Sequence, residues 1–222
     1  MNVRFVSSKH EVGDIHSLFF EPDKPLVWRA GEYINFTVSG VPPAESERIF
    51  TIASAPHEKI LRITTQRGVS PFKDKFFSLQ PGDQVEIDQL GGDFVWQDTP
   101  LPKLYIAGGL GITPFRSILV DRAHKQLPNR AFVMWAGTER QRPFDSELFD
   151  IAAHSTDISI NSYDKMRIDK DLIYAEVPDI HSRLIYIAGS QKFVESIGES
   201  LQKSGLPKNQ IKYDWFDGYT DV

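Results

Sequence analysis

The sequence predicts two domains, an N-terminal antiparallel β-barrel followed by an α/β domain with a five-stranded parallel sheet. Short β-rich segments separated by turn residues fill the first part of the chain, and after Pro100-Leu101-Pro102 strands alternate with helices. The 222 residues, 41 % of them hydrophobic, are enough to bury one or two cores. We therefore expect the β domain to cover residues 1–99 and the α/β domain residues 100–222.

The composition excludes several classes of chemistry. The chain has no cysteine, which rules out a disulfide framework, a thiolate zinc site, a Cys-ligated iron–sulfur cluster and a cysteine nucleophile. The net charge of −5 argues weakly against a nucleic-acid partner. The six histidines have no metal-ligand spacing, so we expect no metal site. We find neither a membrane span nor a leader and expect a cytoplasmic protein.

The first domain should consist of short strands and one helix. Alternating or β-rich runs predict strands at 2–8, 15–21, 33–38, 48–53, 60–65 and 85–88. Phe72, Phe76 and Leu79 fall at helical spacing, and Ser70 and Pro71 are typical residues for a helix start. We therefore predict a helix over 70–79 in an otherwise antiparallel domain.

The second domain should alternate strand and helix with short connections. We predict strands at 104–107, 131–136, 157–162, 184–188 and 211–216. We predict helices from Thr113 through Ala123, over 145–153 and 170–175, and from Ser190 through Leu201. Such alternation is typical of a parallel sheet covered by helices on both faces.

Two short motifs carry chemical information. The first is Ile106-Ala107-Gly108-Gly109-Leu110-Gly111-Ile112-Thr113-Pro114, a buried strand that runs through glycines into a helix start. Glycines allow a ligand to approach the backbone, and a helix start attracts phosphate, although a plain tight turn would look similar. The second is Arg48-Ile49-Phe50-Thr51-Ile52-Ala53-Ser54, which alone could be an edge strand with a solvated arginine.

Together and in this order, the two motifs resemble the ferredoxin–NADP reductase family of flavoenzymes, and the resemblance covers nearly the whole chain. Supporting turns lie in the expected order at Ala30-Gly31-Glu32-Tyr33, Gly68-Val69-Ser70 and Gly91-Gly92-Asp93-Phe94. The resemblance implies an FAD-binding barrel and an NAD(P)-binding α/β domain. It also implies hydride transfer from NADPH or NADH to FAD, followed by electron transfer to a separate acceptor, either a ferredoxin- or flavodoxin-type protein or a small molecule.

The resemblance assigns the flavin site to the first domain. Arg48 would hold the pyrophosphate, Phe50 would pack on the isoalloxazine, and Thr51 would direct its hydroxyl toward flavin N5. Further flavin contacts are expected from Ile52, Ala53, Ser54, Ile63, Thr64, Thr65, Gly68, Val69 and Ser70. The family usually has Tyr where this chain has Phe50, so a hydroxyl is lost there.

The nicotinamide site is assigned to the second domain. Thr113 would approach the nicotinamide and, with Phe50 and Thr51, complete the expected catalytic set. The other expected contacts are Gly108, Gly109, Gly111, Ile112, Pro114 and Gly189, with Phe216 and Tyr219 as an aromatic gate. Many relatives have a cysteine where this chain has Ala188-Gly189-Ser190. Arg140 and Arg142 could clamp a 2′-phosphate, which favours NADPH slightly, although Glu139 opposes it and two loop arginines could simply be solvated.

Two alternatives stay open from the sequence. One is a free-flavin reductase, in which flavin is a substrate that leaves. The other is a non-catalytic flavin-binding subunit or redox sensor. The oligomeric state and the acceptor are not determined by the sequence.

Overall fold

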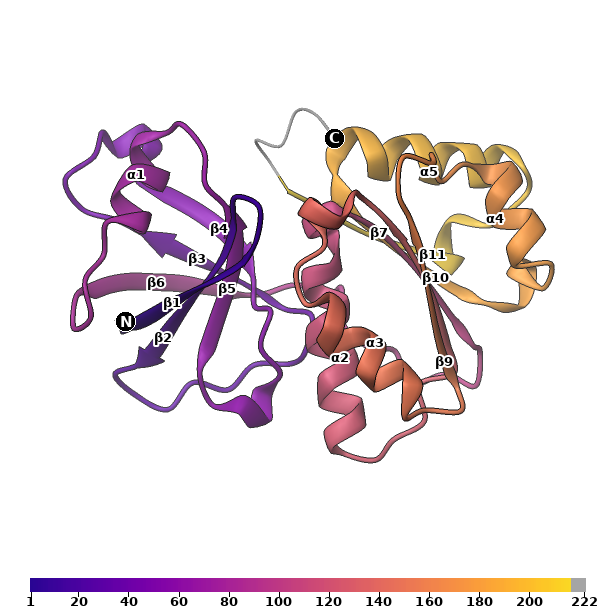
Figure 1. The fold of residues 1–222 in the computed structure, drawn as a ribbon, viewed down its shortest axis with the longest axis horizontal. Helices are drawn as coiled ribbons and strands as arrows, with labels where there is room; N and C mark the ends of the chain where they lie inside the picture. Colours follow the sequence, from indigo (N-terminus) through magenta and orange to yellow (C-terminus); the bar gives the residue numbers. More distant parts are fainter. Residues whose placement is uncertain (217–222) are drawn as a thin grey trace.

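The computed structural model describes residues 1–216, which form two lobes joined by an extended connection (Figure 1). The predicted Tyr219 lies outside the described residues. Phe216 is described only by its backbone, which pairs with Ser190 in the second lobe. Among the described residues no helix is long and apolar enough to cross a membrane.

The first lobe is a six-stranded antiparallel sheet, which confirms the predicted class. Its strands are β1 (Asn2–Val12), β2 (Ile15–Pro22), β3 (Tyr33–Thr37), β4 (Glu47–Thr51), β5 (Leu61–Gln66) and β6 (Gln84–Gly91). They lie in the order β4-β3-β6-β1-β2-β5, with antiparallel neighbours. Just beyond β4, the Ala53 amide donates to the Arg62 carbonyl of β5 at 2.9 Å. This bond connects the two edges of the sheet and closes it toward a barrel.

The single α-helix of this lobe is α1 (Pro71–Phe77), where the sequence predicts it. The Ser70 hydroxyl caps it by accepting from the Lys73 amide at 3.2 Å. Phe72 and Phe76 enter the barrel core, and Leu79 is buried there too although the helix ends earlier. The apolar spacing therefore fixes which face of α1 is buried, while the end of the helix comes two residues sooner than expected.

The second lobe has a five-stranded sheet in the order β11-β10-β7-β8-β9, with every neighbouring pair parallel. The strands are β7 (Lys103–Gly108), β8 (Ala131–Ala136), β9 (Ile158–Tyr163), β10 (Leu184–Ser190) and β11 (Ile211–Phe216). The helices are α2 (Ile112–His124), α3 (Asp145–Ala153), α4 (Lys170–Glu176) and α5 (Gln191–Lys203). The helices α2 and α3 cover one face of the sheet, and α4 and α5 cover the other (Figure 1).

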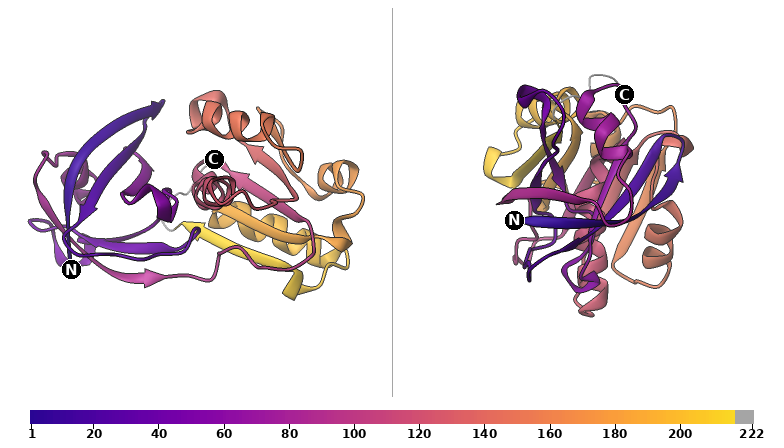
Figure 2. Two further views of the ribbon diagram at one scale, coloured as in Figure 1. Left: turned by 90° about the horizontal axis from the view of Figure 1, so that it is seen from below. Right: turned by 90° about the vertical axis from the view of Figure 1, so that its left-hand side faces the viewer.

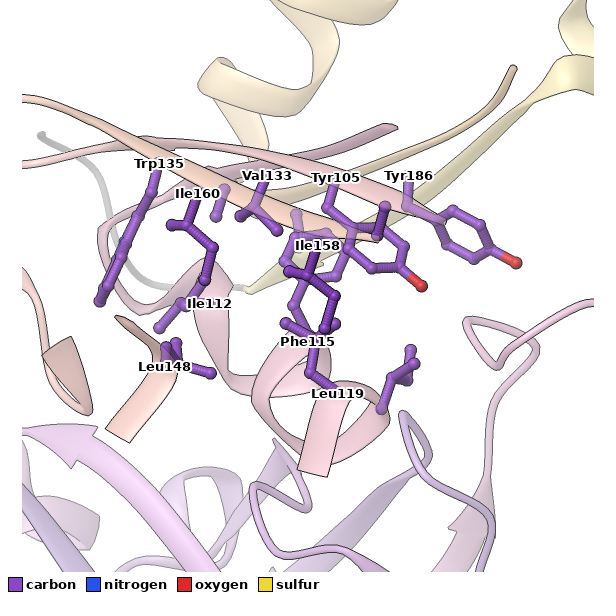
Figure 3. Close-up of a cluster of buried hydrophobic side chains, with 14 of the residues drawn as sticks. Tyr105, Ile112, Phe115, Leu119, Val133, Trp135, Leu148, Ile158, Ile160 and Tyr186 are labelled. Atoms are coloured by element: carbon purple, nitrogen blue, oxygen red, sulfur yellow. The ribbon is translucent and has the colours of Figure 1, made fainter. Parts of the chain in front are cut away.

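The core beneath α2 holds this helix firmly on the sheet. Phe115 and Leu119 of α2 are completely buried against Tyr105, Trp135 and other sheet residues (Figure 3). Ile118 belongs to the same cluster and is also completely buried. Tyr105 stacks on Phe115 with ring centroids 4.6 Å apart. The position of α2 relative to the sheet is therefore set by close packing, which tolerates little displacement.

The strand order creates a switch point beside β7. Along the chain, β7 is the first strand of this sheet. In the sheet it lies in the middle, between β8 and β10. In such sheets ligands bind at the carboxyl ends of the strands near this point. Here those ends carry Gly108, Ala136 and Gly189.

The two lobes lie side by side, and the β1–β2 hairpin extends from the first toward the second (Figure 2). A Cβ added at Gly13, in the hairpin turn, would lie 2.8 Å from the Arg140 carbonyl oxygen, so hairpin and second lobe are in contact. β6 ends at Gly91 and β7 begins at Lys103. The predicted domain boundary after residue 99 falls in this connection and stays a prediction.

Candidate active site between the two lobes

The glycine-rich motif forms a tight passage from β7 into α2. A short 3₁₀ turn, η3 (Gly109–Gly111), separates the two elements. Gly109 has a φ of +50°, and a Cβ there would meet nothing within 4 Å, so this turn faces open space. A Cβ on Gly111 would lie 2.0 Å from the Ala188 carbonyl oxygen. The motif therefore lets α2 begin directly against the end of β10, as the sequence suggests, and leaves its other side open.

Thr113 lies at this helix start and is buried. Its hydroxyl donates to the Leu110 carbonyl at 2.9 Å, which ties the side chain to the turn. The helix begins at Ile112, one residue before the expected Thr113, and Pro114 follows within the first turn, where a missing N–H costs nothing. The expected contact of Thr113 with nicotinamide stays a prediction, and the open space beside Gly109 is where that ring would have to lie.

The Arg48–Ser54 motif runs along β4 and into the contact between the lobes. Arg48 and Phe50 share the β-strand face that meets α1, and Thr51 projects from the opposite face. Phe50 stacks on Phe76 with centroids 5.4 Å apart and an interplanar angle of 10°. One face of the Phe50 ring is thus used by the barrel core.

Thr51 meets a residue that the sequence analysis did not select. Its hydroxyl donates to the Oδ2 of Asp214 at 3.4 Å, across the contact between the lobes. Burial raises the pKa of Asp214 to about 7, and the nearby Asp93 adds to this, against the effect of the Thr51 hydrogen bond. The available signal was a carboxyl between two aromatic residues, Tyr213 and Trp215, in a predicted strand.

Two positively charged side chains, Arg48 of β4 and Lys73 of α1, lie close together where this strand meets the helix. Lys73 of α1 contacts the Thr65 hydroxyl, and the Arg48 guanidinium lies 5.7 Å from the Phe72 ring centroid. Burial lowers the pKa of the Lys73 ammonium to about 7, and the charge of Arg48 contributes. Two cations held close at an energetic cost are typical of an anion site. Lys73 was missed because a lysine in a first helical turn is common on any surface.

The remaining residues expected at the flavin lie in different parts of the structure. Thr64 and Thr65 project from opposite faces of β5, and the Thr64 hydroxyl contacts Ser17 at 2.7 Å. Ile52 and Ile63 belong to the barrel core, and Ala53 to the core of the second lobe. Gly68 and Val69 are exposed, and Ser70 caps α1. Only part of the expected set therefore faces one common surface.

A cavity of about 520 Å³ lies at the carboxyl ends of the parallel strands. Gly108, Gly137 and Ser190 line it near the sheet, and it extends over Tyr163 toward α5. Three cationic residues line it, and no acidic residue does: Lys165, Arg167 and Lys192. The Arg167 guanidinium also donates to the Ser196 hydroxyl at 3.2 Å. The cavity is suited to an anionic ligand of nucleotide size.

The arginines expected to clamp a 2′-phosphate do not line this cavity, although Gln141 between them does. Arg142 pairs with Asp145 at 2.9 Å and donates to the Gly137 carbonyl, so its charge is already matched. Arg140 is exposed in a short turn, η4 (Glu139–Gln141), beside the β1–β2 hairpin. Their predicted role stays a prediction.

Comparisons with known proteins agree with this geometry. Residues 105–199 match the family model described as the oxidoreductase NAD-binding domain. Flavohemoprotein A of Dictyostelium discoideum is 26 % identical over 235 residues, which cover 96 % of this chain but 59 % of that protein. The chain thus spans little more than half the length of this curated relative.

Solved structures share the whole two-lobe arrangement. The crystal structure of an Amycolatopsis cytochrome P450 reductase aligns with a TM-score of 0.82 at 18 % identity, covering 97 % of this chain and 70 % of that one. A ferredoxin NADP⁺ reductase from Neisseria gonorrhoeae with bound FAD and NADP aligns with a TM-score of 0.81 at 16 % identity, covering 96 % and 97 %.

Residues 105–199 thus match an oxidoreductase NAD-binding domain, and the antiparallel sheet of the first lobe precedes it. The chain therefore has the two-domain fold of the ferredoxin–NADP reductase structures, which is the fold that the two motifs predict.

Proposed function

We propose that the chain takes hydride from NAD(P)H onto a bound FAD and passes the electrons to a separate acceptor. One observation carries the proposal: the hydroxyl of Thr51, the last residue of β4, lies 3.4 Å from the Oδ2 of Asp214, in the final strand of the parallel sheet. A flavin ring beside Thr51 and a nicotinamide beside Gly109 would therefore share one space between the lobes.

The residues present fit both groups. Arg48 and Lys73 form a cationic pair that would hold the flavin pyrophosphate. The cavity of about 520 Å³ would receive the nucleotide, and the open side of Gly109 leaves room for the nicotinamide. When bound, FAD supplies the hydride acceptor and can release electrons singly.

The protein's own part is orientation and proton control. The Thr51 hydroxyl has a single proton, which it donates to Asp214 here and would turn toward the reacting edge of the flavin when FAD is bound. Because the pKa of Asp214 lies near 7, its carboxyl could hold or release a proton at working pH. Packing of the two lobes around this point would exclude water.

The deciding experiment is an absorbance spectrum of the purified chain, followed by anaerobic titration with NADH and NADPH separately. A yellow chain that keeps flavin through gel filtration and bleaches on titration is the expected result. Loss of all flavin on the column, with turnover of added flavin, would instead mean a free-flavin reductase. Retained flavin that neither nucleotide reduces would mean a non-catalytic subunit or sensor.

The acceptor needs its own assay. The similar proteins are named as flavohemoproteins, a cytochrome P450 reductase and a ferredoxin reductase, so haem proteins and ferredoxins are the acceptors to test. Reduction of such a partner at the expense of NAD(P)H supports the proposal. If only free flavin or oxygen is reduced, the proposed protein acceptor is wrong.

We also propose that NADPH is preferred over NADH. The support is the set of three cationic residues and no acidic residue lining the cavity, which suits the extra phosphate of NADPH. The variant Arg167→Gln should lower the NADPH-to-NADH ratio of kcat/KM by about 10-fold or more, the value of one charge-assisted contact. Arg140→Gln is the matched control. A larger decrease of this ratio in Arg140→Gln would instead assign binding of the 2′-phosphate to the turn at 139–141.

A further inference from the structure

The helix that begins beside the nicotinamide site is fastened directly to the segment that follows Thr51. Arg116 of α2 is only 1 % exposed, and its Nη1 donates to the Ala53 carbonyl at 2.7 Å. The next residue, Ser117, donates its hydroxyl to the Ser54 carbonyl at 2.8 Å. Two consecutive residues of α2 thus hold two consecutive carbonyls of the first lobe.

Arg116 is also the centre of an ionic network that spans both lobes. Its guanidinium contacts both carboxylate oxygens of Glu58 at 2.8 and 3.0 Å, from the 3₁₀ turn η2 (Pro56–Glu58) of the first lobe. It contacts Glu147 of α3 at 2.9 and 2.6 Å. Arg62 of β5 approaches Glu147 to 3.6 Å and pairs with Glu11 at 2.7 Å, and Lys9 pairs with Glu11 at 3.0 Å, so three cations face three carboxylates.

The network has a geometric rather than an energetic advantage. A buried ion pair often adds little stability beyond what apolar side chains of similar size would give, because both charges lose their hydration. A guanidinium bonded to two carboxylates and a carbonyl, however, admits one orientation only. On its other side α2 is packed against the sheet by Phe115 and Leu119 (Figure 3). The helix is therefore fixed between the sheet and the first lobe.

The distances along α2 connect this network to the proposed reaction. Arg116 follows Thr113 by three residues, about 4.5 Å along the helix axis. The carbonyl that Arg116 holds belongs to Ala53, two residues after Thr51. If Arg116 moved relative to the Ala53 carbonyl, the rigid helix would move Thr113 with it. The distance between Thr113 and Thr51 would then change.

We propose that Arg116 is a positioning residue for hydride transfer, which sets the distance between the Thr51 end of β4 and the Thr113 end of α2. This inference rests on the proposed function. Hydride transfer is sensitive to such spacing, because a displacement of about 1 Å can slow a reaction about 100-fold. Binding of either cofactor would be much less affected, since Arg116 lies outside both the cationic pair and the cavity.

The test compares Arg116→Lys with Arg122→Lys in the flavin-loaded protein. Arg122 is a second buried arginine of the same helix, but it contacts the Pro128 carbonyl and the Trp96 ring, which lies in the connection after β6 and packs on the core of the second lobe. Flavin content, the nucleotide concentration at half-saturation, the limiting rate of flavin reduction and the long-wavelength nicotinamide–flavin charge-transfer absorbance are measured by stopped flow. A general weakening of α2 would affect both variants alike.

The expected result for Arg116→Lys is full flavin content, little change in half-saturation, a limiting rate lower by about 10-fold or more and a weaker charge-transfer absorbance. Arg122→Lys should keep both rate and absorbance. Equal rates in the two variants would overturn the inference, as would a change confined to half-saturation. If the wild-type flavin is itself not reduced, the proposed function fails first, which is a distinct outcome.

Glu58→Gln provides the second variant if Arg116→Lys does not fold. It removes the charged contact with the first lobe and leaves Arg116 bonded to Ala53 and Glu147. A smaller decrease of the limiting rate, with unchanged nucleotide binding, would support the inference. A folded Glu58→Gln protein with the wild-type rate and absorbance would contradict it.

Discussion

The Thr51 hydroxyl donates a hydrogen bond to Asp214 at 3.4 Å, although the two residues are 163 positions apart in the chain. The bond joins the last residue of β4 to the final strand of the parallel sheet. It defines the place where the two lobes face each other and where the proposed reaction would occur.

The first prediction concerns the pH dependence that Asp214 imposes on stability. Its pKa is raised by burial from 3.8 to about 7, so the folded flavin-free protein binds a proton that the unfolded chain releases between these values. The contribution of Asp214 to stability should therefore be fully present below about pH 4 and decline as pH rises toward 7. The variant Asp214→Asn should remove this decline, as measured by urea unfolding across the pH range. A wild-type slope in that variant would show that Asp214 is ionised in the folded protein.

The second prediction concerns the anchor for the flavin pyrophosphate. Arg48→Ala should weaken FAD binding by about 1.5–3 kcal/mol, roughly 10- to 150-fold in Kd, because one charge-assisted contact is lost. Arg4→Ala is a suitable control, since that arginine pairs with Glu21 on the exposed surface of the same lobe. Fluorescence titration with FAD measures both. Equal affinity for the Arg48 and Arg4 variants would remove Arg48 from the site.

The third prediction concerns the close approach of α2 to β10. In Gly111→Ala the new Cβ would lie 2.0 Å from the Ala188 carbonyl oxygen, so one backbone segment must move. We expect a loss of about 1–3 kcal/mol or more in the free energy of unfolding. Gly91→Ala is the matched control, because its Cβ would meet nothing within 4 Å. Urea midpoints that fall equally in the two variants would argue against the steric cause.

The fourth prediction concerns a stacked histidine pair at the contact between the lobes. His57 of η2 and His124 of α2 lie with ring centroids 3.7 Å apart and nearly parallel. Burial lowers the pKa of His57 below 6.5, with His124 and Lys125 contributing and Glu58 and Asp121 opposing. The unfolded chain therefore binds more protons at this site, and the contribution of His57 to stability should fall as pH drops below 6.5.

His57→Asn should make the unfolding midpoint less dependent on pH between about 6.5 and 5. His154→Asn serves as control, since His154 is well exposed and pairs with Asp150. Urea titrations at several pH values measure both variants. An unchanged slope in His57→Asn together with a reduced slope in His154→Asn would assign the effect to the surface histidine.

Much of the fold follows from local rules. The spacing of Phe72 and Phe76 determines the buried face of α1, and Ser70 and Ser190 cap helices as their residue types predict. The glycines before α2 indicate a close approach, and Gly111 meets Ala188 as such an approach requires. These features depend on neighbours within a few residues, so the sequence contains them directly.

The members of the site that sequence reasoning missed are each defined by distant partners. Lys73 becomes notable only beside Arg48, and Arg167 only where the ends of several parallel strands enclose a cavity. Arg140 and Arg142 looked better placed along the chain, but Arg142 is matched by Asp145 and neither lines the cavity. Charge in a loop does not reveal which way the loop faces.

The sequence by itself determined the strands, the helices, their caps and the two motifs, because hydrophobic period and turn chemistry act locally. Only the tertiary structure decided that Asp214 meets Thr51 and that Arg116 bonds to Ala53 and Glu58. Those contacts depend on how two separately folded lobes pack together. Burial between them then changes the pKa of Asp214, which no property of the isolated segment could fix.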